Sequence, residues 1–339
     1  MKVNVTSMDV ARLAQVSQSA VSRAYTPGAS VSDNTRARVM DAAKKLGYRP
    51  NAIARSLITK RSRIIGLVMS RLDNQFYPVV LEKLSQRLQR DGYHVLLFIS
   101  DARGADTVLT EILQYQVDGI VMASTVLSSA LARDCANAGI PVVLFNRMTR
   151  QAANDEHPAS SVTSDNETGA RLVARHLVAA GHQRIAYIAG LEESSTNVDR
   201  ERGFRDELRR LGSRIHAQAV GNYHFETAQR AAHELFASPH DRPDAVFVGS
   251  DHMAIAVMDV LRIELGLQVP LDVSVVGFDN VPQAAWGAYQ LSTVEQPIEP
   301  MIEATAALLH EQLEGEVSAR AVTVPCRLVL RASTRGAAP

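Results

Sequence analysis

Three side chains near the start of the chain are suited to reading DNA: Gln18, Ser19 and Arg23. When the N-terminal residues of a helix enter the major groove, short polar side chains reach base edges while Arg and Lys contact phosphates. The residue types at these positions therefore predict a helix that binds nucleic acid.

The distribution of charge supports a nucleic-acid partner for the same segment. The 339 residues include 36 basic and 36 acidic side chains, so the whole chain has no net charge. Residues 1–63 nevertheless hold 12 basic and three acidic side chains, a net charge of +9, and the remainder carries −9. Such asymmetry is typical of a nucleic-acid-binding head, and the alternative is a basic face that only meets solvent.

Three short helices are expected to position these side chains. Thr6 and Asp9 can cap a helix over residues 7–14, whose apolar residues recur at helical spacing. Ser17 can cap a second helix after a short break, and a third helix is expected over residues 33–46. The pattern predicts a compact unit in which the first two helices meet at a tight turn.

Sequence motifs in this segment have a specific order and spacing. They are DVARLA, VS..AVSR, VS..TR.RV..AA..LGYRPN and A.SL, within VTSMDVARLAQVSQSAVSRAYTPGASVSDNTRARVMDAAKKLGYRPNAIARSL. The whole segment resembles the head of the LacI/GalR family of transcriptional regulators. The resemblance implies a helix-turn-helix DNA-binding head over residues 1–49 and a hinge helix or linker over 50–61. The family usually has Gly in the turn where this chain has Gln15, which would require a positive backbone angle.

The resemblance also implies residue roles. Gln18 and Ser19 would face base edges, and Arg23 would hydrogen-bond a guanine through two nitrogens. The hinge helix would form on DNA, pair with its dimer mate and push Leu57 into the minor groove, which bends the duplex; ordinary helix packing is the alternative for Leu57. The residues assigned to DNA are Thr6, Ser17, Gln18, Ser19, Ser22, Arg23, Asn51, Ala54, Arg55 and Leu57.

Beyond residue 62, short β-branched runs alternate with helical stretches, as in IIGLVMS, PVVLFNR, RIAYIAG and VSVVGFD. This alternation predicts an α/β architecture of two similar doubly wound lobes with parallel sheets, which bind ligand where the strands end. Residues 64–335 resemble the two-lobe, periplasmic-binding-protein-like core of the same family, with HLVAAGHQRIAYIAG, DRERGF and VSVVGFDN among the matching motifs. The expected subdomains are 62–161 with 293–324, and 162–292 with 325–339.

The resemblance places ligand candidates at the strand ends. A sugar-like ligand needs flat rings for its apolar face and amide or charged groups for its hydroxyls. The guanidinium of Arg200 can donate two hydrogen bonds to hydroxyls or to a carboxylate. Asp279 can accept hydrogen bonds from hydroxyls or pair with Arg200. The alternative for both residues is a purely structural ion pair. For the aromatic residues, core packing is the alternative. The effector candidates are Phe76, Tyr77, Asn146, Arg200, Tyr223, Ser250 and Asp279, whereas Asp251 is expected to cap a helix.

Other classes of protein fit the sequence less well. No GxGxxG, GxxxxGK, HExxH or CxxC pattern occurs, so no enzymatic activity, metal site or cofactor is predicted. The absence of a membrane-length apolar run and of a signal peptide predicts a cytoplasmic protein without a membrane partner. The absence of a signal peptide and the net charge of +9 on residues 1–63 also argue against a sugar-binding transport protein.

The sequence therefore predicts a homodimeric, effector-responsive transcriptional regulator that binds double-stranded operator DNA. It is expected to repress genes of carbohydrate or sugar-acid utilisation from a palindromic operator and to be released by a sugar or sugar acid. The expected mechanism is that ligand closes the lobes, shifts the first lobes across the dimer axis and prevents the hinge helices from pairing. A corepressor-dependent regulator of the same family is the alternative.

Overall fold

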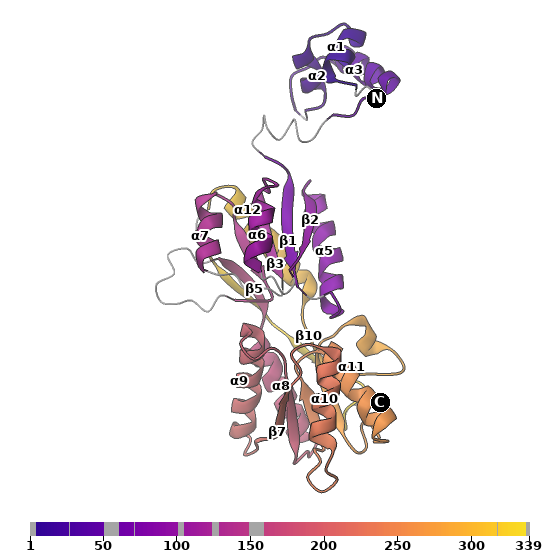
Figure 1. Cartoon of the computed structure of the whole chain (residues 1–339), viewed down its shortest axis with the longest axis vertical. Coiled ribbons are helices and arrows are strands. Elements are labelled where there is room, and N and C mark those ends of the chain that lie inside the picture. The colour runs from indigo at the N-terminus through magenta and orange to yellow at the C-terminus, as the bar shows by residue number, and fades with distance from the viewer. Residues whose placement is uncertain are drawn as a thin grey trace. The chain divides into compact units, whose positions relative to one another are not determined.

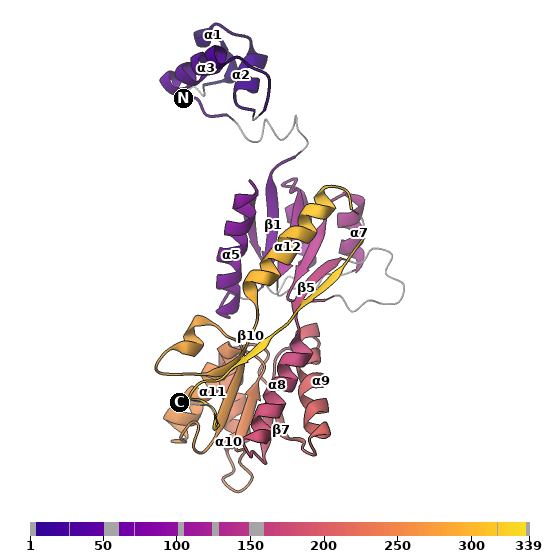
Figure 2. The same ribbon diagram turned by 180° about the vertical axis from the view of Figure 1, so that it is seen from behind.

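The structure, a computed structural model, describes residues 5–26, 28–50, 61–70, 72–100, 105–123, 129–148, 159–316 and 318–336. These residues belong to two compact units that divide after Ser62. The smaller unit is helical and the larger one contains two α/β lobes (Figures 1 and 2). No helix in the described parts of the chain is long and apolar enough to cross a membrane.

The small unit has three helices: α1 (Ser7–Ala14), α2 (Gln18–Ala24) and α3 (Asp33–Leu46). Side chains of Thr6, Ser17 and Ser32 accept backbone hydrogen bonds at the three N-termini, and Gly47 ends α3 in the left-handed conformation. Small aliphatic side chains from all three helices form its core: Val10, Ala11, Ala14, Val21, Ala24, Val39, Ala42 and Ala43. The predicted bounds of the first and third helices are confirmed, and α2 begins directly after its predicted cap, Ser17.

The first lobe is built on a parallel sheet with the strand order β11-β5-β4-β3-β1-β2. Its strands are β1 (Ile64–Met69), β2 (His94–Ile99), β3 (Gly119–Ala123), β4 (Val142–Phe145), β5 (Ser160–Ser164) and β11 (Ala321–Val324). One face is covered by α5 (Phe76–Arg90) and α12 (Ile298–Leu313), the other by α6 (Ala105–Leu113) and α7 (Ser129–Asn137). Because side chains alternate along a strand, Leu67 and Val68 enter different cores.

The second lobe has the same design, with the strand order β12-β10-β9-β8-β6-β7. Its strands are β6 (Ile185–Ala189), β7 (Ile215–Val220), β8 (Ala245–Val248), β9 (Ser274–Asp279), β10 (Ser292–Glu295) and β12 (Arg327–Val329). Helices α8 (Asn166–Ala179) and α9 (Ser195–Arg210) cover one face, and α10 (Phe225–Phe236) and α11 (Asp251–Asp259) the other. Only β12, of the strands described in this lobe, is antiparallel to its neighbour.

The chain passes between the two sheets three times. The first two crossings follow β5 and β10, so the predicted boundaries at 161 and 292 fall inside strands and are wrong by about three residues. Both strands are rich in Ser and Thr, and these residues are typical of linkers although here they are buried. The third crossing joins β11 to β12 at residues 325–326, and Figure 2 shows this yellow segment running from one lobe into the other.

Candidate functional site

The turn between α1 and α2 has the geometry of a helix-turn-helix. Thr6 and Asp9 form a reciprocal capping box at the start of α1, in which each accepts a hydrogen bond from the other's backbone N–H. Gln15 ends α1 in the left-handed region with φ 53°, which confirms the predicted positive backbone angle. Ser17 then caps α2 by accepting the Ala20 N–H. Gln15 thus adopts in this turn a backbone conformation that glycine adopts more readily.

The exposed face of α2 carries four of the ten residues predicted to contact DNA: Gln18, Ser19, Ser22 and Arg23. Ser22 and Arg23 are exposed, and no described residue pairs with the Arg23 guanidinium. Gln18 donates a 3.0 Å hydrogen bond to a hydroxyl of α1, and the Ser19 hydroxyl lies 2.9 Å from that of Ser17. Helix α2 thus presents the unengaged guanidinium of Arg23 beside short polar groups. The predicted hinge residues lie outside the described residues: Asn51, Ala54, Arg55 and Leu57.

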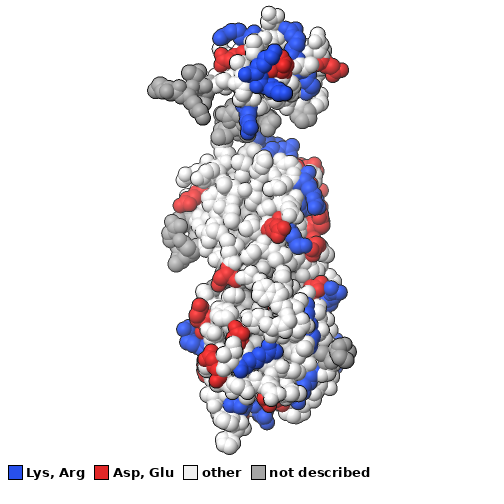
Figure 3. Space-filling model, turned by 90° about the vertical axis from the view of Figure 1, so that its right-hand side faces the viewer, with Lys and Arg blue, Asp and Glu red and all other residues white. Residues whose placement is uncertain are grey.

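Two basic side chains of the head have a structural role. Arg36 of α3 donates to the carbonyl of Ala24 at the end of α2. Arg38 donates to the carbonyl of Ala14 at the end of α1, at 2.6 Å. Both therefore satisfy helix C-terminal carbonyls that have no partner within their own helix. Other Lys and Arg side chains remain on the surface of the head, where Figure 3 shows them in blue.

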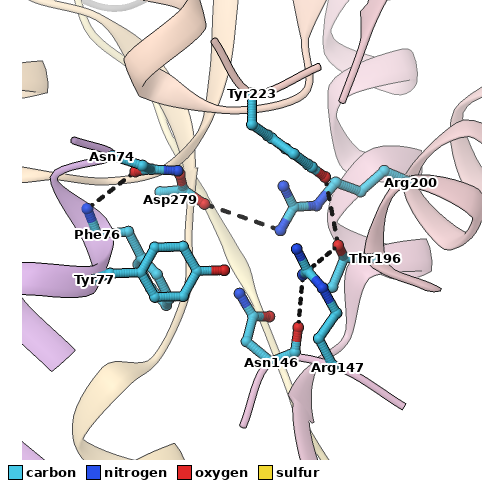
Figure 4. Close-up of a pocket in the computed structure, with 9 residues that line it drawn as sticks. All are labelled: Asn74, Phe76, Tyr77, Asn146, Arg147, Thr196, Arg200, Tyr223 and Asp279. Atoms are coloured by element: carbon cyan, nitrogen blue, oxygen red, sulfur yellow. Dashed lines mark hydrogen bonds and ion pairs between the residues drawn. The ribbon is translucent and has the colours of Figure 1, made fainter. Parts of the chain in front are cut away.

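A pocket lies between the two lobes, where the strands end (Figure 4). The polypeptide that follows β1 and β4 supplies its first-lobe side, and α9, the loop after β7 and the end of β9 supply the other. Carboxyl ends of parallel strands meet at one edge of a sheet, which explains why distant residues gather there. The lining residues are Asn74, Phe76, Tyr77, Asn146, Arg147, Thr196, Arg200, Tyr223 and Asp279. Six of the seven predicted effector residues are among them.

Arg200 is 2% exposed and is held by the second lobe. Its Nε donates to the Asn166 side chain at 2.8 Å and its Nη1 to the carbonyl of Gly249 at 2.5 Å. Its guanidinium carbon lies 3.7 Å from the ring centroid of Phe278, and its Nη2 lies 3.9 Å from a carboxylate oxygen of Asp279. Most of the guanidinium is therefore engaged within the protein.

Asp279 and Asp251 form a pair of buried carboxyl groups. One Asp279 oxygen accepts a 2.6 Å hydrogen bond from Gln296, and the other is buried without a partner among the described residues. Asp251 accepts from the Thr293 hydroxyl at 2.5 Å and from the Val281 N–H at 2.9 Å. Burial raises the pKa of both carboxyls, and the charge of Asp279 raises the pKa of Asp251 further. The free oxygen of Asp279 is a ready acceptor for a ligand hydroxyl.

Ser250 does not line the pocket, so its assignment to the effector is wrong. It is fully buried, and its hydroxyl caps α11 by accepting the Met253 N–H at 3.3 Å. Ser250 has an extended backbone, as an N-cap requires, while Asp251 is already inside the helix. The expectation that Asp251 caps this helix is corrected for the same reason.

Three pocket residues were missed: Asn74, Arg147 and Thr196. Arg147 follows the predicted Asn146 directly, and Thr196 precedes Arg200 by one helical turn, so both neighbours could have indicated them. Arg147 is 7% exposed and donates through Nη1 to the carbonyl of Asn146 at 2.8 Å and to the Thr196 hydroxyl at 2.9 Å. Because Thr196 belongs to the other lobe, Arg147 bridges the cleft.

Further contacts between the lobes leave little room in the pocket. The Met148 N–H donates to the Ser195 hydroxyl at 3.1 Å, and the Gln283 amide donates to Gln75 at 3.2 Å. The free space is about 10 Å³, enough for about one water molecule. A larger ligand enters only if some of these contacts rearrange.

Comparison with known proteins identifies both units. Residues 6–51 match the family described as "Bacterial regulatory proteins, lacI family", and residues 174–334 match "Periplasmic binding protein-like domain". Catabolite control protein A of Priestia megaterium is 30% identical over 339 residues, which cover 98% of this chain and all of that protein.

Solved structures agree over the same length. The lac repressor dimer bound to operator and the anti-inducer ONPF has a TM-score of 0.86 at 28% identity, covering 98% of this chain and 99% of that one. The complex of the regulator CelR with cellobiose has a TM-score of 0.71 at 30% identity, covering 97% and 99%. These similarities span the head and both lobes, and the chain is therefore a DNA-binding transcriptional regulator that belongs to the lacI family of bacterial regulatory proteins.

Proposed function

We propose that the chain acts as a homodimeric repressor of carbohydrate or sugar-acid utilisation genes, and that a small polyhydroxylated ligand releases it from a palindromic operator. The observation that carries the proposal is the pocket lined by polar side chains of both lobes in a chain that also has a DNA-binding head. A ligand that contacts both lobes changes their relative arrangement, which gives it a physical route to the head.

The operator side of the proposal rests on α2. Ser17, Gln18 and Ser19 lie at its N-terminus, which is the end that enters the major groove in helix-turn-helix proteins. Ser22 and Arg23 lie in its last turn, three and four residues after Ser19 and therefore on the same side of the helix. The lac repressor of similar structure is a dimer bound to operator. Two heads related by a twofold axis read two half-sites of opposite direction, so we expect a palindromic site.

The ligand side rests on the acceptors and rings of the pocket. Asp279 and Asn146 each have a buried side-chain oxygen without a partner among the described residues, and such oxygens suit hydroxyl groups. Tyr77 and Tyr223 supply rings and hydroxyls, while Phe76 packs on Phe145 and belongs to the core. The cellobiose complex of CelR supports a sugar as ligand.

The proposed mechanism differs from simple closure of an open cleft. Arg147 already contacts Thr196 across the cleft, and Gln75 already contacts Gln283. Ligand entry therefore has to break some of these contacts and replace them with its own. The resulting shift of the first lobe is the step that we propose is passed to the hinge segment 50–61 and to the DNA.

Operator selection followed by ligand release tests the proposal. The purified protein selects binding sites from random duplex DNA, and its affinity for the selected site is then measured with neutral sugars, sugar acids, sugar phosphates and nucleobases. We expect a palindromic site and one sugar-related class that weakens binding. The same ligand at 100 times its dissociation constant raises the free energy of unfolding by about 2.7 kcal/mol.

Asp279→Asn should abolish the ligand effect, while Asp206→Asn, on the exposed surface of α9, should not. A ligand that tightens operator binding would replace the proposal with the corepressor alternative. Selection of no defined sequence would refute the operator side.

A further inference from the structure

Three charged side chains line the pocket: Arg147, Arg200 and Asp279. Arg200 has its own partners, since Asn166, Gly249 and Asp279 surround its guanidinium. Arg200 lies close to Asp279, which is the only carboxylate among the residues that line the pocket. The positive charge of Arg147 therefore still needs a negatively charged partner.

The Arg147 guanidinium is buried without a counterion. Its side chain makes two hydrogen bonds, both through Nη1 and both to uncharged oxygens, at Asn146 and Thr196. No carboxylate of the described residues lies within ion-pair distance of it, and the Tyr223 ring centroid lies 6.0 Å from its guanidinium carbon. Removing a charge from water without a partner is expensive, so such a group has a strong tendency to bind an anion.

Asp279 cancels this charge only in part, because the charge of Arg200 acts on Asp279 more strongly than that of Arg147 does. Asp279 already faces Arg200, and burial raises the pKa of Asp279 and of Asp251 behind it, so the two carboxyls carry fewer than two negative charges near neutral pH. Figure 4 shows Arg147 beside Asn146, with Asp279 and Asn74 across the pocket. One part of the pocket is thus cationic, while another offers acceptors for hydroxyls.

From this arrangement we propose that the effector is an anionic sugar derivative, whose acid group binds the free Nε and Nη2 of Arg147 while its hydroxyls bind Asp279 and Asn146. The proposal rests on the proposed function and narrows its ligand to one chemical class. In this proposal, Arg147 is the residue that makes the pocket prefer an anionic ligand to an uncharged one. The Nη1 of the same guanidinium contacts Thr196, so the acid group would bind directly beside this bridge between the lobes.

Matched pairs of compounds test the proposal on the unaltered protein. Calorimetric titration compares D-galacturonate with D-galactose and with methyl D-galacturonate, D-gluconate with D-glucitol, and D-glucose 6-phosphate with D-glucose. We expect at least one acid to bind at least tenfold more tightly than its uncharged counterpart, a difference of about 1.4 kcal/mol. The uronate, aldonate and phosphate arms distinguish a carboxylate from a phosphate.

Variants then assign the preference to Arg147. Arg147→Gln should weaken binding of the acid about 10- to 100-fold more than binding of its uncharged counterpart, because only the acid loses a charged hydrogen-bond pair. Arg147→Lys should restore part of the preference. Arg209→Gln, on the exposed surface of α9, is the matched control and should change nothing.

The outcomes separate this inference from the proposed function. Equal binding of acids and neutral sugars, or an equal loss of both in Arg147→Gln, overturns the anionic ligand and leaves a sugar-responsive regulator. If none of these compounds binds and a nucleobase does, the proposal that the effector is related to a sugar is itself overturned. The comparison of the acid with its methyl ester needs no variant, so it holds even if Arg147→Gln fails to fold.

Discussion

Arginines in the head have different surroundings, which assigns them different functions. Arg23 is exposed on α2 and no described residue pairs with it, while Arg36 and Arg38 are bound to the ends of neighbouring helices. Removal of Arg23 therefore affects only what α2 contacts, whereas removal of Arg38 leaves a carbonyl of α1 without its partner.

We predict that Arg23→Ala loses about 1–3 kcal/mol of discrimination at one base pair in each half-site, because that amount is typical of a bidentate contact to guanine. The free energy of unfolding should not change. Competition binding with a set of single-base operator variants measures the effect. An unchanged base preference would assign specificity to another residue of the head.

Glu207 on α9 is a carboxylate with a strongly perturbed pKa. It is 4% exposed and accepts hydrogen bonds from Arg210 and Arg175, each 2.6 Å from Oε1. These bonds lower its pKa from 4.5 to about 2. A carboxyl whose pKa is lower in the folded than in the unfolded state stabilises the fold above the unfolded value. That stabilisation disappears as the pH falls from about 4.5 through about 2.

Glu207→Gln should therefore lower the free energy of unfolding by about 1–2 kcal/mol at pH 7, a range below the full pKa linkage because both arginines are partly exposed. The difference between variant and native protein should shrink between pH 4.5 and pH 3. Denaturant unfolding at pH 7, 4.5 and 3 measures this. A difference that is constant over the three values would contradict the assigned pKa.

The residues of the pocket were predictable to different degrees. Six came from the resemblance, which assigned ligand contacts to these positions. Ser250 was wrong because the adjacent Ser and Asp both suit an N-cap, and only the backbone decides which residue occupies it. Arg147 and Thr196 lie next to predicted residues, but their importance comes from a contact between the lobes that the sequence does not show.

Packing of α8 against α9 depends on a residue without a side chain. A Cβ atom at Gly203 would lie 2.3 Å from the backbone oxygen of Glu167 on α8. Two helices approach this closely only when one of them has glycine at the contact. Since α9 also carries Thr196 and Arg200, this contact fixes the position of one wall of the pocket.

Gly203→Ala should force α9 away from α8 and destabilise the second lobe by about 1–3 kcal/mol, the usual range for overpacking. Ligand binding should weaken in parallel. Gly287→Ala is the control, because a Cβ there meets no atom within 4 Å. Thermal unfolding and ligand titration of both variants check the prediction, and equal behaviour would show that α8 and α9 adjust to the methyl group at no cost.

Helices and strands followed from the sequence more accurately than the boundaries of the lobes. Capping residues and apolar spacing mark α1, α2 and α3, and both features are local. Strands β5 and β10 carry buried Ser and Thr, so their composition does not show to which sheet they belong. Sheet membership is a property of pairing between distant segments, and it had to come from the structure.

Coupling between ligand and DNA is a property of the whole molecule, and it has to act in both directions. If a ligand weakens operator binding, the operator weakens ligand binding by the same factor, which is about 5- to 150-fold for typical coupling energies. We therefore predict that the dissociation constant of the effector rises by a factor in this range when saturating operator duplex is present. Calorimetric titration with and without the duplex measures it, and unchanged affinity would show that the two sites are independent.

The path of the chain through its units has an evolutionary consequence. One segment joins the head to the rest of the protein, while the two lobes exchange the chain three times. A single recombination event near residue 60 can therefore give the head a new sensor, but no single event can exchange one lobe for that of a relative. We infer that operator choice and effector choice are inherited as separate modules, whereas the two walls of the pocket have to evolve together by point mutation.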